Sequence, residues 1–194
     1  MTTKLVLREL SRYPIGTFAD IIYRNALLFP DSEAFVYDTQ PISFSEFNHR
    51  VNRLIHGLQA LGIKKGDNIG ILSWNRIEYC EVFGAAMTGG FVLSHFNPRL
   101  QAEELIQVFN DSQARLMFFS DEFVEIIDAI RERLSPTKMF SVFGNEIEPL
   151  RAYKSLLKNR SVGEPDTTVN TDDPLVIFYT SGTTGVPRGA IYTH

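Results

Sequence analysis

The sequence has little of what would tie a protein to a membrane or to the outside of a cell. Cys80 is its one cysteine, which rules out an internal disulfide framework and favours a reducing compartment. The longest apolar runs, such as Leu116 to Phe119 and Leu175 to Tyr179, are far too short to cross a bilayer. The N-terminal residues also lack an apolar segment long enough for a secretory signal. These absences predict a cytoplasmic protein without a transmembrane segment.

An excess of positive charge is also missing. The chain has 19 Lys and Arg against 23 Asp and Glu, with a net charge of −4, and the two signs are mixed along its length. Nucleic-acid-binding proteins usually carry a concentrated basic surface, so nucleic acid is not an expected partner. With 194 residues, 44% of them hydrophobic, the chain is long enough to bury one sizeable core.

Metal-binding and nucleophilic patterns are also absent. His49 and His56 lie on nearly the same face of an expected helix, but no Cys or carboxylate completes a ligand set at helical spacing. We expect both to be solvated or half-buried. Cys80 lies on the apolar side of a helix with no His near it in sequence, so a buried small hydrophobe is favoured over a nucleophile. Trp74 follows a strand where a substrate could pass, but a core aromatic is the favoured interpretation.

Strand and helix patterns alternate through most of the chain. Ser43 and Glu46 form a capping-box pattern at the start of a helix with a clear apolar stripe. The expected helices span residues 17–28, 44–61, 76–88, 101–110, 120–134 and 150–158, and the expected strands 34–37, 41–44, 68–73, 91–93, 116–119, 138–143 and 175–178. A polar segment, 159–174, reads as an internal linker. This order predicts an α/β fold, with a mostly parallel sheet and helices on both faces. Such folds bind ligands beyond the carboxyl ends of their strands.

The most informative segment follows the last expected strand and reads FYTSGTTGVPRGAIYTH. Glycines allow tight turns and close approach of backbone N–H groups to a ligand, and hydroxyls both donate to and accept from phosphate oxygens. Arg188 adds a planar cation. The phosphate-binding candidates are Thr180, Ser181, Gly182, Thr183, Thr184, Gly185, Arg188 and Gly189. A ligand-free Gly/Thr turn is the alternative, but so many donors with a cation favour a triphosphate site.

This segment differs from the two common phosphate-binding patterns. Counted from Gly182, the P-loop pattern would need Gly and Lys where Pro187 and Arg188 stand, and no Ser or Thr follows. No part of the segment has the G-x-G-x-x-G spacing of the dinucleotide fingerprint either.

YTSGTTGVPRG followed by TH resembles the signature loop of the adenylate-forming enzymes, which include acyl-CoA synthetases, aryl-CoA ligases, luciferases and peptide-synthetase adenylation domains. In that family the loop grips the β- and γ-phosphates of ATP while a carboxylate attacks the α-phosphorus. The resemblance implies phosphate contacts from Thr180 through Gly185 and a cationic contact from Arg188, with Thr184 and Arg188 as catalytic candidates. The family usually has Lys where Arg188 stands.

The resemblance extends from about residue 15 to the end of the chain. The segments from Ile42 to Leu72 and from Ser73 to Phe119 are similar to the family's opening helices and core strands. Asn97-Pro98-Arg99-Leu100 looks like the acyl-CoA synthetases rather than the amino-acid adenylation domains. The resemblance implies that residues 1–194 form part of the large N-terminal domain of an acyl-CoA synthetase-like enzyme.

Family members are much longer than this chain, and their Mg²⁺ ligand, ribose-binding aspartate and catalytic lysine lie further along. We therefore expect a fragment that ends just after the phosphate loop and is inactive alone. We also expect a mobile loop near its end and apolar surface that favours self-association.

The function expected of the parent protein is ATP-dependent activation of a fatty or aromatic acid to an acyl-adenylate, then to an acyl-CoA. Its co-substrates would be ATP and coenzyme A, with Mg²⁺ as cofactor. Two alternatives stay open: an adenylation or luciferase-like enzyme that passes the acyl group to another acceptor, and a non-catalytic nucleotide-binding module.

Overall fold

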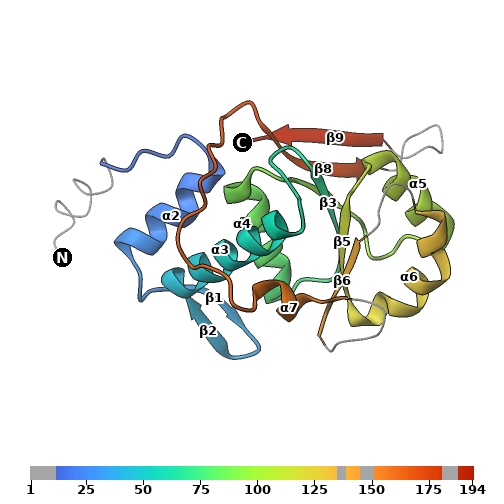
Figure 1. Cartoon of the computed structure of the whole chain (residues 1–194), viewed down its shortest axis with the longest axis horizontal. Coiled ribbons are helices and arrows are strands. Elements are labelled where there is room, and N and C mark those ends of the chain that lie inside the picture. The colour runs from blue at the N-terminus through green and yellow to red at the C-terminus, as the bar shows by residue number, and fades with distance from the viewer. Residues whose placement is uncertain (1–11, 135–138, 145–150, 181–187) are drawn as a thin grey trace.

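The computed structural model describes residues 12–134, 139–144, 151–180 and 188–194. Its main sheet has seven strands in the order β7-β6-β5-β3-β4-β8-β9 (Figure 1). The strands are β3 (Asn68–Leu72), β4 (Val92–His95), β5 (Leu116–Ser120), β6 (Met139–Phe143), β7 (Arg151–Ala152), β8 (Pro174–Thr180) and β9 (Arg188–Thr193). All pairings are parallel except that of β8 with β9. The predicted α/β fold with a mostly parallel sheet is therefore confirmed.

Helices cover both faces of the sheet. The helices α3 (Phe44–Ala60), α4 (Ile77–Gly89) and α7 (Tyr153–Leu157) share a hydrophobic core with one face, and α5 (Ala102–Ser112) and α6 (Val124–Ile130) share a core with the other. The alternation along β5 assigns Leu116 and Phe118 to the first core, and Met117 and Phe119 to the second. Because successive strand residues point to opposite faces, a continuous apolar strand is buried on both sides.

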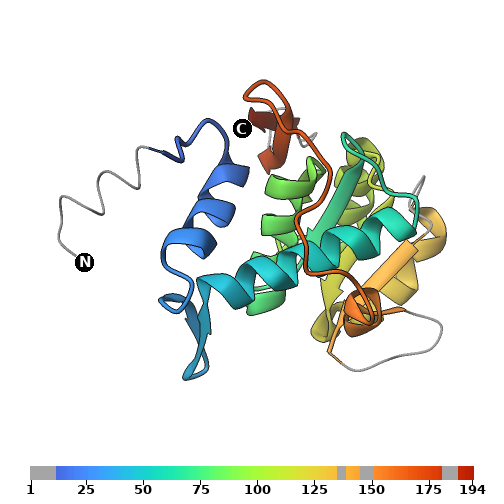
Figure 2. The same ribbon diagram turned by 60° about the vertical axis from the view of Figure 1, so that its left-hand side comes forward.

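The helix α2 (Phe18–Leu28) and the hairpin of β1 (Glu33–Tyr37) and β2 (Gln40–Ser43) precede this layered body. Asp38 and Thr39 both have positive φ, as expected for the turn between two hairpin strands. Helix α2 packs beside α3 and α4, at the side of the molecule remote from α5 and α6 (Figures 1 and 2).

Helix α3 begins and ends as the sequence indicates, with one difference. The Ser43 hydroxyl accepts a hydrogen bond from the Glu46 N–H at 3.2 Å, which is one half of the predicted capping box. The Glu46 carboxylate pairs with Arg50 at 2.7 Å. The predicted stripe is confirmed, since Val51, Leu54, Ile55 and Leu58 are fully buried. The helix ends before Gly62, whose φ of +82° favours glycine.

Two predicted helices are wrong in their extent. The segment expected to be one helix from 120 to 134 consists of a 3-10 helix (Asp121–Phe123), the short α6, and a second 3-10 helix (Arg131–Arg133). The Ser120 side chain makes no capping hydrogen bond. The segment expected to be a helix from 150 to 158 begins as β7, which adds an edge strand beside β6, and only then becomes α7.

The polar segment between α7 and β8 crosses the body as an ordered strap (Figure 2). Its Glu164 accepts hydrogen bonds from the side-chain amides of Asn48 and Asn52 at 2.7 and 3.1 Å. Asn52 also donates to the carbonyl of Val162 at 2.9 Å. We define the strap as residues 159–173. The polar composition of this segment predicted a linker. In the structure, its hydrogen bonds to Asn48 and Asn52 hold it along α3.

Candidate active site

The signature segment connects two paired strands at one end of the sheet. Strand β8 ends at Thr180 and β9 begins at Arg188, and these two residues are register partners. Tyr179 is likewise paired with Gly189. Thr180 and Arg188 are therefore held across from each other, both exposed. Ser181, Gly182, Thr183, Thr184 and Gly185 lie outside the described residues.

Gly189 is required by close packing between the two strands. A Cβ at this position would lie 2.7 Å from Cγ2 of Ile177 and 3.3 Å from the Tyr179 ring. The Tyr179 hydroxyl in turn donates to the carboxylate of Asp111 on α5 at 2.8 Å. Burial, together with this carboxylate, raises the pKa of Tyr179 above its ordinary value, so the hydroxyl keeps its proton. These contacts fix the strand end from which the signature segment departs.

The carboxyl ends of neighbouring strands bring further side chains to the same edge. His95 ends β4 and is the register partner of Phe178 on β8, and the two rings meet edge-on at 5.6 Å. Tyr79 of α4 places its hydroxyl 2.7 Å from Nδ1 of His95. Burial raises the pKa of Tyr79 to about 12 and lowers that of His95. A protonated phenol beside a neutral imidazole fits a hydrogen bond donated by the Tyr79 hydroxyl.

Trp74 corrects a prediction. It was expected to be a core aromatic, but the structure leaves 49% of it exposed. It follows the end of β3, and the Arg99 guanidinium lies 5.9 Å from the centre of its ring. The helices cover the two faces of the sheet but not the space beyond the carboxyl ends of its strands. Trp74 is exposed because it lies in that uncovered space. His95 was missed as a site residue, although its position at the end of β4 was a signal for it. Tyr79 of α4 and Arg99 were also missed, and no such signal marked them.

The remaining candidates behave nearly as expected. His49 and His56 are half-buried, and His56 Nε2 lies 3.0 Å from the carbonyl oxygen of Gly163 in the strap. Cys80 is half-buried rather than buried, and burial raises the pKa of its thiol. Among the described residues no three His, Cys, Asp or Glu side chains are grouped to hold a metal ion. Within the same residues, no helix is both long and apolar enough to span a membrane.

The fold and this strand edge define a class: α/β proteins whose open, mainly parallel sheet presents its carboxyl ends to a ligand. A family model described as "AMP-binding enzyme" matches residues 22–194. The chain belongs to this family.

Two relatives similar to this chain are CoA ligases. The chain is 32% identical over 178 residues to the long-chain-fatty-acid–CoA ligase FadD13 of Mycobacterium tuberculosis strain H37Rv, covering 90% of this chain and 34% of the relative. It is 32% identical over 159 residues to the 3-methylmercaptopropionyl-CoA ligase of Ruegeria lacuscaerulensis, covering 78% of this chain and 30% of the relative. The chain therefore spans about a third of the length of these relatives.

The fold agrees with a solved structure of the family. The N-terminal domain of FACL13 from Mycobacterium tuberculosis superposes with a TM-score of 0.83 at 29% identity. The match covers 93% of this chain and 45% of that domain structure. The arrangement of sheet and helices described above is thus that of an AMP-binding enzyme's N-terminal domain.

Proposed function

We propose that the chain supplies the triphosphate-binding part of an enzyme that activates a fatty or aromatic carboxylic acid and transfers it to coenzyme A. One observation carries this proposal: the glycine- and hydroxyl-rich segment departs from the carboxyl end of β8, with Thr180 and Arg188 held across from each other. Membership of the AMP-binding family and the printed activities of the two relatives, both CoA ligases, support it.

The proposed reaction has two steps. A carboxylate oxygen of the acid attacks the α-phosphorus of ATP, the bond from that phosphorus to the bridging oxygen breaks, and pyrophosphate leaves. The thiol of coenzyme A then loses its proton to solvent and attacks the acyl carbon. The bond from that carbon to the phosphate oxygen of AMP breaks, and AMP departs with the bonding electron pair. Negative charge builds on the pyrophosphate oxygens in the first step, so donors placed around them lower the barrier rather than only tightening binding.

Each proposed residue has a role in that step. We assign the β- and γ-phosphate contacts to Thr180, Ser181, Gly182, Thr183 and Gly185, with Gly189 keeping the two strands close. Thr184 and Arg188 are the proposed catalytic residues, with Arg188 placing a planar cation beside the departing pyrophosphate. Mg²⁺ is part of the proposal through the family, but the described residues offer no ligand set for it, and no step is assigned to it.

Acid-dependent pyrophosphate release by the proposed whole enzyme tests this function. The assay uses a panel of fatty and aromatic acids, with and without CoA. Release that requires both acid and CoA supports the ligase. Release with acid alone indicates transfer to another acceptor. No release with any acid favours a nucleotide-binding module, for which the Arg188 departure from the family's Lys is the supporting observation.

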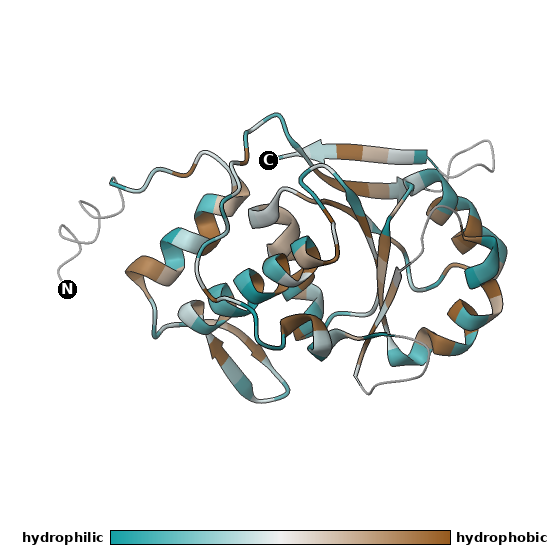
Figure 3. Cartoon of the chain, viewed as in Figure 1, coloured by the Kyte–Doolittle hydropathy of each residue, from teal (hydrophilic) through white to brown (hydrophobic). Residues whose placement is uncertain are grey.

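We also propose that the chain acts in the cytoplasm, where a free thiol such as that of Cys80 stays reduced. Self-association of the 194-residue chain is a further proposal. It is supported by the exposed apolar side chains of β8 and β9, which are Phe178, Ile191 and Tyr192. Both strands carry brown, hydrophobic bands in Figure 3.

A further inference from the structure

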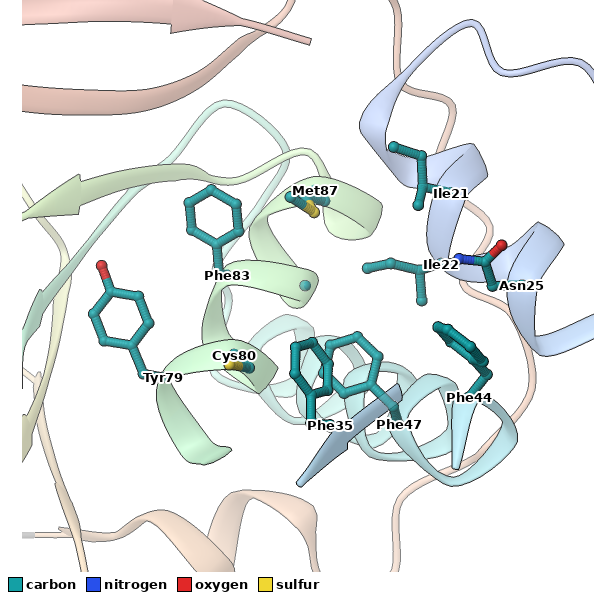
Figure 4. A pocket seen from close by; sticks show the side chains of 11 residues that line it. Ile21, Ile22, Asn25, Phe35, Phe44, Phe47, Tyr79, Cys80, Phe83 and Met87 are labelled. Atoms are coloured by element: carbon teal, nitrogen blue, oxygen red, sulfur yellow. The ribbon is translucent and has the colours of Figure 1, made fainter. Parts of the chain in front are cut away.

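Two pockets beside α3 and α4 differ in charge. In the described part of the chain, the pocket between α2, α3 and α4 is walled by uncharged, mostly apolar side chains (Figure 4). The other lies between the β1–β2 hairpin, α3, the start of α4, and α7, and we call it the polar pocket. Its volume of about 510 Å³ is within the range of small-molecule sites. A charged ligand loses its hydration in the first pocket without gaining a partner, so of the two only the polar pocket suits one.

The polar pocket is lined by four cationic side chains and three carboxylates, which leaves an excess of one positive charge. All three carboxylates are paired with two of the cations. Arg50 lies 2.7 Å from Glu46 and 3.2 Å from Glu81. Arg76 lies 2.8 Å from Glu78. These charges largely offset one another, so the capacity of the pocket for an anion lies with its two remaining cations.

The remaining cations are Arg53 of α3 and Lys154 of α7. Within the described residues, neither has a carboxylate at salt-bridge distance. The two helices that carry them are packed tightly, because a Cβ added at Gly57 of α3 would overlap the carbonyl oxygen of Leu156 in α7. Arg53 is four residues before Gly57 and therefore on the same face of α3. The packing thus fixes two uncompensated cations from two different elements at one pocket.

The donors of these two side chains match a phosphate better than a carboxylate. The planar guanidinium of Arg53 can pair with two oxygens at once, and the ammonium of Lys154 supplies a third contact. A phosphate monoester offers three terminal oxygens and a charge of about −1.5 to −2 at pH 7, whereas a carboxylate offers two oxygens and one charge. Tyr37 and Pro41 of the hairpin and Leu157 of α7 complete the wall with aromatic and apolar surface.

We propose that the polar pocket binds a small organic phosphate monoester. Its phosphate lies between Arg53 and Lys154, and its apolar body packs against the hairpin and α7. The inference is independent of the proposed ligase activity, because the lining residues come from the hairpin, α3, α4 and α7. A failure of acid-dependent pyrophosphate release therefore leaves it standing.

Calorimetric titration of the 194-residue chain tests the ligand class. Phenyl phosphate is the probe, inorganic phosphate lacks the apolar body, and benzoate lacks the third oxygen. We expect phenyl phosphate to bind more tightly than either of the other two. No detectable binding of phenyl phosphate, or binding of benzoate that is equally tight, would overturn the proposal.

Charge-matched substitutions test the place of binding. Arg53→Gln and Lys154→Gln should each weaken the binding of phenyl phosphate by about tenfold, because each removes a charge-assisted hydrogen bond. Arg151→Gln and Lys158→Gln remove the same charges at exposed positions outside the lining and should leave the affinity unchanged. Equal weakening in all four variants would mean that only the net charge matters, which contradicts a site in the polar pocket.

Chemical labelling locates the ligand in the unsubstituted chain, so the test does not depend on how the variants fold. Lysines are acetylated with an N-hydroxysuccinimide ester, and the rate at each lysine is followed by peptide mass spectrometry. Phenyl phosphate should slow the acetylation of Lys154 but not that of Lys158, which is exposed four residues further along. Unchanged rates at both lysines, or equal slowing at both, would contradict binding at the polar pocket.

Discussion

Arg188 is the described residue on which the proposed chemistry depends most. It is exposed at the start of β9, so its guanidinium is free to turn toward a phosphate beyond the end of β8. We expect Arg188→Ala to lower acid-dependent pyrophosphate release by the proposed whole enzyme by about 10- to 100-fold, because a charge-assisted hydrogen bond contributes about 1.5–3 kcal/mol. Arg188→Lys keeps the charge and should retain most of the rate. Equal losses in the two variants would mean that planarity, not charge, is what the site uses.

Glu81 is the residue whose protonation should most affect stability. It is 2% exposed, and its carboxylate accepts hydrogen bonds from Tyr153 at 2.6 Å and from Arg50 at 3.2 Å. Burial raises the pKa of Glu81 above its ordinary value of 4.5, although these two donors counteract part of the rise. A raised pKa means that the stability contributed by the protonated acid is present below pH 4.5 and is lost as pH rises through the folded-state pKa.

We therefore expect Glu81→Gln to gain stability relative to the wild type as pH rises above the ordinary carboxyl pKa, measured by urea unfolding across a pH series. Glu122→Gln, at an exposed position, is the control and should show no such trend. Tyr153→Phe should cost about 1–3 kcal/mol of unfolding free energy, because it removes a donor from a buried carboxylate. A pH-independent difference between Glu81→Gln and the wild type would contradict the assignment.

At the scale of single residues, the sequence indicates chemistry more readily than environment. The residue types of the run from Thr180 to Gly189 are enough to predict a phosphate-binding segment, and that role stays a prediction. The exposure of Trp74 could not be predicted from the sequence, because a Trp that follows an apolar strand can be either buried in the core or exposed at the end of the sheet. The Tyr79–His95 hydrogen bond joins residues 16 positions apart and exists only because α4 returns along the sheet.

Among the elements, the strap over α3 has the clearest measurable consequence. Asn52 is fully buried and donates to Glu164 and to the carbonyl of Val162. We expect Asn52→Ala to destabilise the chain by about 1–3 kcal/mol and to speed proteolysis within the strap, because the two hydrogen bonds from this buried amide to the strap are lost. Gln59→Ala, which removes only a 3.5 Å exposed contact to Thr167, is the matched control. Similar proteolysis of both variants would show that the strap is held by other contacts.

The regular elements were predictable where one physical signal dominated. The stripe of α3 and the apolar strands β3 and β5 follow from periodicity and burial alone. The helix expected at residues 120–134 failed because its pattern is locally compatible with 3-10 turns at both ends, and only tertiary packing decides between the two. β7 was missed because a two-residue edge strand has no sequence period and is defined by its neighbour β6.

At the scale of the whole molecule, β9 is the outermost strand at one edge of the main sheet among the described residues. All six of its residues are exposed, and its partner β8 exposes Phe178. An exposed edge strand with apolar side chains is a template for pairing with another chain. We expect the 194-residue chain to form concentration-dependent oligomers in light scattering after size exclusion, and Ile191→Lys to shift it toward the monomer. A monomer at every concentration would contradict this prediction.

The central claim is that the segment between β8 and β9 holds the phosphates of ATP while a carboxylate is activated. The most direct test is acid-dependent pyrophosphate release by the proposed whole enzyme in which Thr183, Thr184 and Arg188 are all replaced by alanine. Removing one preorganised donor typically costs about 100- to 1,000-fold in kcat, so the triple variant should lose at least that much while its far-UV circular dichroism stays unchanged. Full turnover in a folded triple variant would contradict the account.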